Sequence, residues 1–147
     1  MIAVVQRVLS SRVTVDNVTV GEIKKGLNVL LGVKQGDNEK DAQYLAKKIC
    51  DLRIFEDNNG KMNLSIKDIA GQMLIISQFT LLADTKKGNR PSFTNAAEPD
   101  QAQKLYEEFI KNVGFNGISA QQGIFGANML VEIFNDGPVS IILDSRI

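Results

Sequence analysis

The sequence predicts a single α/β domain in which a curved, barrel-like and largely antiparallel sheet carries two main helices. Three observations support this prediction. The 147 residues suit one domain, which would span residues 1–147. Strand-like apolar segments dominate the chain, and most connections between them are as short as those of hairpins. Only two segments have helical spacing, whereas a doubly wound parallel sheet would need more helices.

The predicted strands are recognised by Val- and Ile-rich alternation or by unbroken apolar runs. Residues 1–15 alternate in part, whereas residues 27–33 form the continuous apolar run that is typical of a strand buried on both faces. Asp16-Asn17 and the segment 57–60 have the composition of turns. The strand patterns lie at about residues 1–15, 18–20, 27–33, 53–56, 62–66, 73–79, 117–121, 128–135 and 139–144.

Two helices are predicted from apolar residues that recur at helical spacing. The first spans about residues 39–52, and Asp37-Asn38 offers it an N-cap. The second begins at Pro99, because proline fits the first turn of a helix. Its apolar stripe consists of Ala102, Leu105, Tyr106, Phe109, Ile110 and Val113.

The absence of histidine is the most informative feature of the composition. It excludes catalysis by Ser-His-Asp or Cys-His groups and removes the commonest ligand of a catalytic zinc. Cys50 is the only cysteine, so no intrachain disulfide can form and no structural zinc site is expected. No glycine motif for a nucleotide cofactor occurs, so we expect neither metal nor cofactor. An enzyme of this composition would work with carboxylates, hydroxyls, backbone groups or groups of its substrate.

The charges of the chain balance, with 17 basic and 17 acidic residues. A protein that follows nucleic acid mainly through phosphates is usually basic, so any RNA contact should be local and confined to one end of the RNA. The N-terminus carries an early Arg7 and lacks the apolar run of a signal peptide. No segment approaches the ~20 apolar residues of a membrane span. We therefore expect a cytoplasmic protein without membrane or disulfide-linked partners.

The segment Ser77-Gln78-Phe79-Thr80-Leu81 places polar side chains at the end of an apolar strand. The residue types by themselves favour a solvated strand end without a function. The alternative is that backbone N–H groups left open at the strand end hold a developing oxyanion. Thr80 is a candidate nucleophile, although the chain has no histidine to activate it.

The segment 135–140 contains Asp136-Gly137-Pro138, which by composition favours a tight hairpin turn. The same Gly-Pro pair can instead hold a cis peptide bond, which is uncommon and usually purposeful where it occurs. The sequence does not decide between the two isomers.

Residues 83–98 predict a long basic loop with few large apolar side chains. Its Lys86, Lys87 and Arg90 are either solvated surface charges or contacts for phosphates near a nucleic-acid end. The glycines of the segment 123–127 fit a bend or a bulge between strands.

Taken together, these segments resemble the D-aminoacyl-tRNA deacylase family. The family motif SQFTL is intact at residues 77–81, and Gly137-Pro138-Val139-Ser140 corresponds to the family's GPVT-like segment. The order of these segments, their spacing and the chain length make the resemblance specific. Further matching segments lie at residues 4–8, 87–93, 123–127, 135–139 and 143–145.

The resemblance implies a barrel-like homodimer whose active sites lie at the subunit interface and whose substrate is the aminoacyl-tRNA 3′ end. The Gly137-Pro138 pair would be cis, enter the partner's site and block an L side chain with its carbonyl groups. Glycine has no side chain to reject, so the resemblance also admits glycyl-tRNA, including glycine mischarged on alanine tRNA. The other substrate-binding residues expected are Phe125, Met129, Lys86 and Arg90.

The resemblance also implies roles for the catalytic segment Ser77, Gln78, Phe79 and Thr80. Phe79 would support the terminal adenosine, and the backbone of residues 78–80 would face the ester. Either Thr80 forms an acyl-enzyme, or the ribose 2′-OH of the tRNA positions or activates water; we favour the second because histidine is absent. Ser140 replaces the threonine frequent in the family and keeps its hydroxyl, so we expect little loss; the Gly-Pro loop would be slightly looser if the threonine methyl packs against it.

Two hypotheses from other classes remain open beside the deacylase. One is a noncatalytic homodimer that binds RNA ends and depends on Lys86, Lys87 and Arg90, although the balanced charge counts against it. The other is a structural dimer in which changes at Gln78 or Phe79 would alter association alone.

Overall fold

The first strand organises the sheet in the computed structural model, which describes residues 1–146. One edge of β1 (Ile2–Val15) pairs antiparallel with β8 (Leu130–Asp144) along nearly its whole length. The other edge pairs first with β3 (Gly26–Gly32) and then with β2 (Val18–Ile23), both antiparallel. The turn between β1 and β2 uses Asp16 and Asn17 at positive φ, as a tight hairpin requires.

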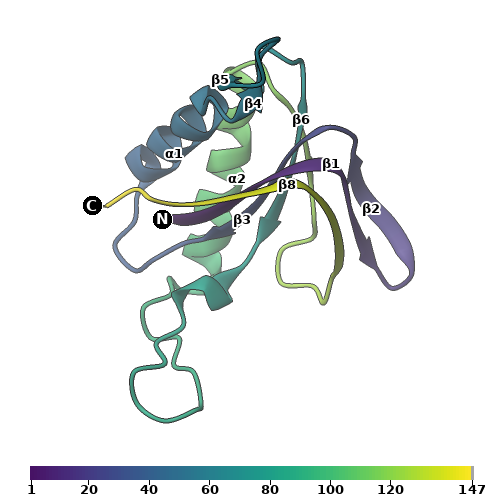
Figure 1. Cartoon of the computed structure of the whole chain (residues 1–147). Helices are drawn as coiled ribbons and strands as arrows, with labels where there is room; N and C mark the ends of the chain where they lie inside the picture. Colours follow the sequence, from purple (N-terminus) through teal and green to yellow (C-terminus); the bar gives the residue numbers. More distant parts are fainter. Residues whose placement is uncertain (147) are drawn as a thin grey trace.

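The parallel half of the sheet carries the helices. Beyond β3, the sheet continues with β6 (Gln72–Ser77) and β7 (Ser119–Gln122), each parallel to its neighbour. Parallel neighbours need crossover connections, and each crossover here contains one helix, α1 (Glu39–Asp51) or α2 (Pro99–Phe115). The two helices contact each other over the sheet (Figure 1). The predicted barrel-like α/β architecture with two main helices is therefore confirmed.

A close approach between β2 and β7 nearly closes the sheet into a barrel. A Cβ atom on Gly21 would lie 2.8 Å from the carbonyl oxygen of Gln122, so only glycine allows these strands to come so near. A small apolar cluster lies inside the curve, with Val8, Leu74 and Ile76 buried in it.

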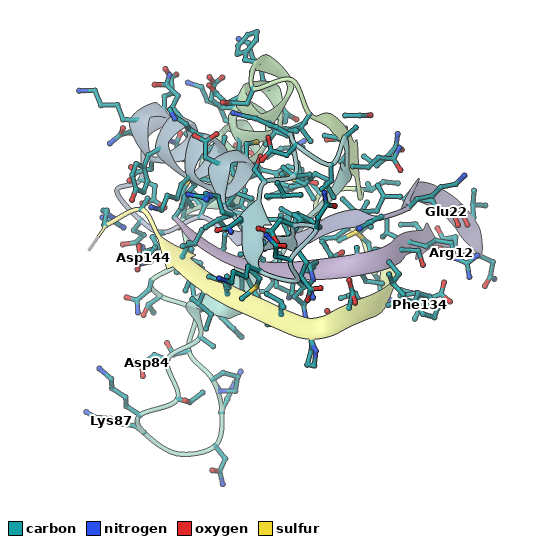
Figure 2. The ribbon with its side chains drawn as sticks, turned by 45° about the horizontal axis from the view of Figure 1, so that its top comes forward. Arg12, Glu22, Asp84, Lys87, Phe134 and Asp144 are labelled. Carbon is teal, nitrogen blue, oxygen red and sulfur yellow. The ribbon has the colours of Figure 1, made fainter. Side chains whose placement is uncertain are left out.

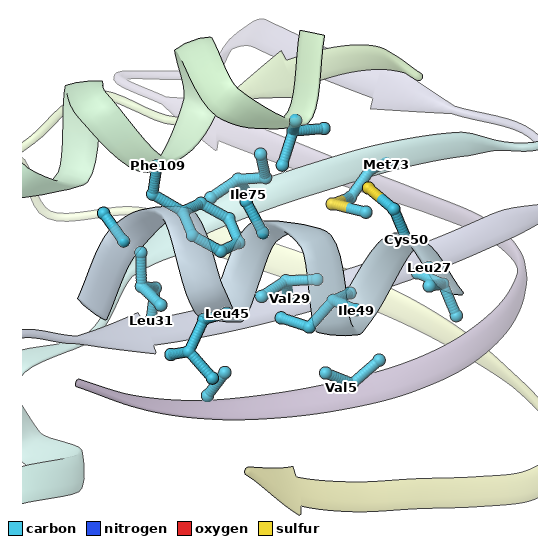
Figure 3. Packing of buried hydrophobic residues seen from close by; sticks show 14 of the residues in the cluster. Val5, Leu27, Val29, Leu31, Leu45, Ile49, Cys50, Met73, Ile75 and Phe109 are labelled. Atoms are coloured by element: carbon cyan, nitrogen blue, oxygen red, sulfur yellow. The ribbon is translucent and has the colours of Figure 1, made fainter. Parts of the chain in front are cut away.

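The main core lies between the sheet and the two helices. Figure 3 shows Val5, Val29 and Ile75 from the strands against Leu45 and Phe109 from the helices. All five side chains are fully buried. Burial of each such side chain contributes about 1.5–3 kcal/mol, so this layer holds the strand ends in place.

The remaining elements are short. β4 (Phe55–Glu56) and β5 (Met62–Leu64) form a separate hairpin, as the turn at residues 57–60 predicts. The predicted strand 73–79 is too long, because β6 ends at Ser77 and the chain turns into the 3₁₀ helix η1 (Phe79–Leu82). None of the helices within residues 1–146 has the length and apolar character needed to cross a membrane.

The prediction that Asp136-Gly137-Pro138 separates two strands in a hairpin turn is wrong. β8 is continuous, and residues 136–139 form a bulge within it. Asn135 pairs with Val8 and Ser140 pairs with Gln6, so the four bulged residues face Arg7 alone. The composition is that of a local chain reversal, but β1 is long enough to pair with the chain on both sides of the bulge.

Candidate active site

A cavity of about 470 Å³ opens beside the carboxyl ends of the parallel strands β3 and β6. This is the edge at which α/β sheets usually bind their ligands. Within residues 1–146, no side chain that lines the cavity is ionisable; its polar side chains are Ser77, Gln78 and Asn128. The lining consists of Leu31, Val33, Pro99, Ala102, Val131 and the segments 76–79, 96–97 and 125–129.

The floor of the cavity is the end of β6. The N–H of Gln78 donates to the carbonyl of Leu31 at 2.8 Å, which is the last parallel rung before the chain turns into η1. The Gln78 side-chain amide donates to the Thr80 hydroxyl oxygen, and Thr80 itself is exposed and outside the cavity lining. Thr80 therefore has an amide, and not a base, as its side-chain partner. Within residues 1–146, no group of three or more acidic, cysteine or histidine side chains could hold a metal ion.

Phe79 projects from the rim of the cavity. Its side chain is 56% exposed, which is unusual for a large aromatic residue. Phe93 meets it edge-to-face, with ring centroids 5.0 Å apart and an interplanar angle of 67°. An exposed ring held in this way offers a flat face on which a base can stack.

The opposite wall comes from the loop between β7 and β8. Gly126 has a φ of +78° and the N–H of Ala127 donates to the Ile124 carbonyl at 3.1 Å, so the loop turns tightly and directs Phe125 and Met129 to the cavity. Below it, the Tyr106 hydroxyl donates to the Ile75 carbonyl at 2.8 Å. Burial raises the pKa of Tyr106, so the hydroxyl stays a neutral donor.

The Tyr106 ring lies 5.9 Å from Phe125 and so supports this wall from α2. The hydroxyl of the same residue joins the helix to β6, and a single side chain therefore connects α2, the floor of the cavity and its far wall.

The Gly137–Pro138 bulge lies elsewhere on the molecule. Its peptide bond is cis, as the resemblance implies, and both residues are exposed. Arg7 is buried beneath it: its guanidinium donates from Nη1 to the Ile54 carbonyl at 2.8 Å and from Nε to the Asp136 carbonyl at 3.2 Å. The Asp136 carboxylate is also 3.4 Å from Nε, so the bulge rests on a charged group with fixed partners.

Register within the sheet separates the bulge from the cavity of the same chain. The bulge lies opposite Arg7 of β1. Ser77, at the cavity, pairs with Leu31, and Leu31 pairs with Ala3. Ala3 lies four positions from Arg7 along β1. At ~3.4 Å per residue, this offset alone is about 14 Å. Gly137 and Pro138 accordingly do not line the cavity.

The fold thus gathers some of the residues singled out in the sequence and leaves others apart. Those that meet at the cavity are Ser77, Gln78, Phe79, Phe125 and Met129. Thr80 lies next to them, whereas Gly137, Pro138, Lys86 and Arg90 lie at other places.

Sequence reasoning missed Arg7 and Tyr106 as supporting residues. The signs of Arg7 were its charge within the strand-like segment 4–8 and the match of that segment to the family. Tyr106 gave no sign of its own, because its spacing is that of an ordinary helical stripe.

The fold and the cavity define a class: an α/β protein with a substrate-sized, uncharged site at the ends of its parallel strands. A family model described as D-Tyr-tRNA(Tyr) deacylase matches residues 4–144. The chain therefore belongs to this family, and the expected membership is confirmed.

The relatives cover the whole chain. A D-aminoacyl-tRNA deacylase of Clostridioides difficile (strain 630) is 57% identical over 99% of this chain and 97% of its own length. A D-aminoacyl-tRNA deacylase of Dehalococcoides mccartyi (strain ATCC BAA-2100 / JCM 16839 / KCTC 5957 / BAV1) is 59% identical over 99% of this chain and 95% of its own length. The enzyme class expected from the sequence is the class of these relatives.

Solved structures agree with this fold. A protein titled c-Myc DNA Unwinding Element Binding Protein is 40% identical, with a TM-score of 0.91 over 98% of both chains. A probable eukaryotic D-amino acid tRNA deacylase shares the fold at 16% identity, with a TM-score of 0.81 over 97% of both chains.

Proposed function

We propose that this chain hydrolyses the ester between a D-amino acid and the terminal ribose of tRNA, releasing the amino acid and the tRNA. The names of its relatives support this substrate class. The observation that carries the proposal is the cavity at the SQFTL segment, whose described lining has no ionisable side chain. Such a site can hold and orient an ester, and it leaves the movement of protons to the substrate and water.

In the proposed mechanism, a water molecule attacks the ester carbonyl, and the 2′-OH of the terminal ribose positions or activates this water. The first N–H groups of a helical turn have no partner inside that turn, so those of Phe79 and Thr80, at the start of η1, are suited to hold the oxyanion. The carbon–oxygen bond to the ribose then breaks, and the ribose oxygen takes up the proton that the attacking water has lost. Phe79 would stack on the terminal adenosine. Thr80 is disfavoured as the nucleophile because its only described side-chain partner is the amide of Gln78.

The proposed chiral filter is the Gly137–Pro138 bulge of a second copy of the chain. In one chain, the register of the sheet separates this bulge from the cavity, so a bulge that borders the cavity must belong to a partner. Its main-chain carbonyls would occupy the space that an L side chain needs, whereas glycine and D residues would fit. Glycyl-tRNA is therefore a second proposed substrate.

A homodimer would also cover an exposed apolar surface on β8. Leu130, Phe134 and Ile142 are 57–70% exposed on this strand, which pairs with β1 alone. Edge strands with large exposed apolar side chains are typical of surfaces that associate. We place this dimer in the cytoplasm, where charged tRNA is used.

The decisive experiment compares the two enantiomers of one substrate. The purified protein should release D-tyrosine from D-tyrosyl-tRNA and leave L-tyrosyl-tRNA intact, with release followed on labelled amino acid. Equal release of both enantiomers, or release of neither, would contradict the proposal.

A second candidate function is nucleic-acid binding without turnover. It is favoured by the similarity to a protein whose title names binding to a DNA unwinding element. This candidate predicts tight binding of uncharged nucleic acid and no release of D-tyrosine in the assay above. A structural dimer predicts neither activity, and changes at Phe79 would then alter association alone.

A further inference from the structure

A narrow loop, residues 84–92, projects from the body of the protein, and we refer to it as the basic arm. Figure 1 shows it extending away from the sheet after η1, and Figure 2 shows Asp84 near its root and Lys87 near its tip. Asp84 and Ser92 exchange backbone hydrogen bonds of 2.7 and 2.9 Å, which join the two sides of the root. The carboxylate of Asp84 accepts from the Lys86 N–H at 2.9 Å, and Gly88 at φ +67° reverses the chain. The backbone conformation of the arm is therefore set by hydrogen bonds within the loop itself.

The arm carries three cations that have no acidic partner among the described residues. Lys86, Lys87 and Arg90 are exposed, and within residues 1–146 none of them takes part in an ion pair; other exposed lysines are unpaired too, but these three lie within five residues of one another. Asp84 is the only acid in the arm, so the arm has a net charge of about +2 in a chain whose total is zero. Unpaired cations gathered on one projection form a site for an anionic partner.

The arm connects directly to the rim of the candidate active site. Phe93, which follows the arm, packs edge-to-face on Phe79 at 5.0 Å, and Phe79 lines the cavity. Exposed rings next to cations are the combination that binds single-stranded nucleic acid, because bases stack on the rings and phosphates meet the cations.

We propose that the basic arm binds the phosphates of the nucleotides that precede the terminal adenosine of the substrate. From Asp84 to Gly88, four residues can extend at most about 14 Å, and stacked nucleotides advance ~3.4 Å each, so the arm reaches along at most about four nucleotides. That length matches a short single-stranded 3′ end and not a long duplex. The inference rests on the proposed function, since it names how the substrate of the same site is held.

The test compares two substrates, D-tyrosyl-tRNA and D-tyrosyl-adenosine, which lacks the preceding phosphates. In the variant Lys86→Ala/Lys87→Ala/Arg90→Ala, kcat/KM for the tRNA should fall at least tenfold more than kcat/KM for the adenosine ester. The plot of log kcat/KM for the tRNA against log salt should become shallower by about 2, because each lost contact with a single strand removes ~0.7 from its slope. A matched control with the same change in charge is Lys48→Ala/Lys61→Ala/Lys111→Ala, whose lysines are all exposed and lie outside the arm.

The variant Lys86→Arg/Lys87→Arg/Arg90→Lys keeps the three positive charges but changes the side chains that carry them. It should therefore keep the wild-type salt dependence. Binding of a fluorescent single-stranded RNA tetranucleotide, measured on the same variants, tests the arm without any turnover. If the alanine variant and the lysine control act alike on the tRNA and on the tetranucleotide, the arm inference is wrong even where D-tyrosine is released. If no ester is cleaved but the alanine variant alone loses the tetranucleotide, the deacylase proposal fails and the arm inference falls with it, because the arm then binds single-stranded RNA that is not the substrate of this site.

Discussion

At the scale of single residues, the site depends on side chains that support the backbone more than on reactive groups. Arg7 donates to the Asp136 carbonyl in the Gly-Pro bulge and is itself anchored by the Ile54 carbonyl, and Tyr106 joins α2 to the floor of the cavity. Thr80, the candidate nucleophile of the sequence analysis, bonds to an amide. The chemistry should therefore be insensitive to Thr80 and sensitive to the supporting residues.

Thr80→Ala tests the nucleophile directly. We expect kcat to fall less than tenfold with D-tyrosyl-tRNA, because a threonine without a base is a weak nucleophile. Substrate that ends in 2′-deoxyadenosine should react at least a hundredfold more slowly with the wild-type protein, by single-turnover measurement. Loss of turnover with Thr80→Ala alone would show that Thr80 is the nucleophile.

Arg7→Met tests the support of the bulge. The change leaves the buried Ile54 carbonyl and the partly buried Asp136 carbonyl without their donor, and the buried one alone costs about 1–3 kcal/mol in the free energy of unfolding. The bulge should become mobile, and the ratio of D to L turnover should fall at least tenfold. Arg12→Met is the control, since Arg12 pairs with Glu132 at the surface and its loss should change stability little. An unchanged ratio in Arg7→Met would remove Arg7 from the filter.

At the scale of elements, helix α1 begins with a complete capping box. The Asn38 side chain accepts from the Lys40 N–H at 2.9 Å, and the Asp41 carboxylate accepts from the Asn38 N–H at 2.9 Å. Burial tends to raise the pKa of Asp41, but hydrogen bonds from Asn38 and Ser145 outweigh it, and the pKa is lowered overall.

Removal of this cap should destabilise the fold by a measurable amount. Asn38→Ala should lower the free energy of unfolding by about 1 kcal/mol in urea titration. Gln43→Ala, at an exposed position of the same helix, should change it by less than about 0.5 kcal/mol. Because the folded pKa of Asp41 is lowered, its contribution is complete above the unfolded value of ~3.9 and is lost as the pH falls through the folded value. Equal stability of the two variants at pH 7 would contradict the role of the cap.

At the scale of the whole molecule, the proposed function assigns the two halves of the site to different chains. Subunit mixing tests this arrangement. Subunits with Phe79→Ala should be inactive but carry an intact bulge, whereas subunits with Gly137→Ala/Pro138→Ala should cleave both enantiomers.

When the inactive subunits are added in excess, nearly every unselective subunit pairs with an intact bulge. We expect cleavage of L-tyrosyl-tRNA to disappear while cleavage of D-tyrosyl-tRNA remains. Persistence of L cleavage at all mixing ratios would mean that the bulge does not act on the partner's site. Excess wild-type subunits are the positive control, since they supply the same bulge.

The sequence by itself determined the local elements and the motifs. Helix α1 has its apolar stripe and its cap within one short segment, and the turn at Asp16-Asn17 needs no distant partner, so both follow from local preference. The motif SQFTL and the Gly-Pro pair likewise identified the family. The absence of histidine excluded whole classes of catalytic chemistry.

Only the tertiary structure decided which of these segments meet. Residues 77–79 and 125–129 are far apart in the sequence, and they share a cavity because the parallel register of β3, β6 and β7 brings them to one edge of the sheet. Asp136-Gly137-Pro138 became a bulge and not a turn because β1 pairs with β8 on both sides of it. Local composition indicates how easily the backbone bends. Strand pairing depends instead on hydrogen bonds and burial between segments that are distant in the sequence, so no single segment determines it.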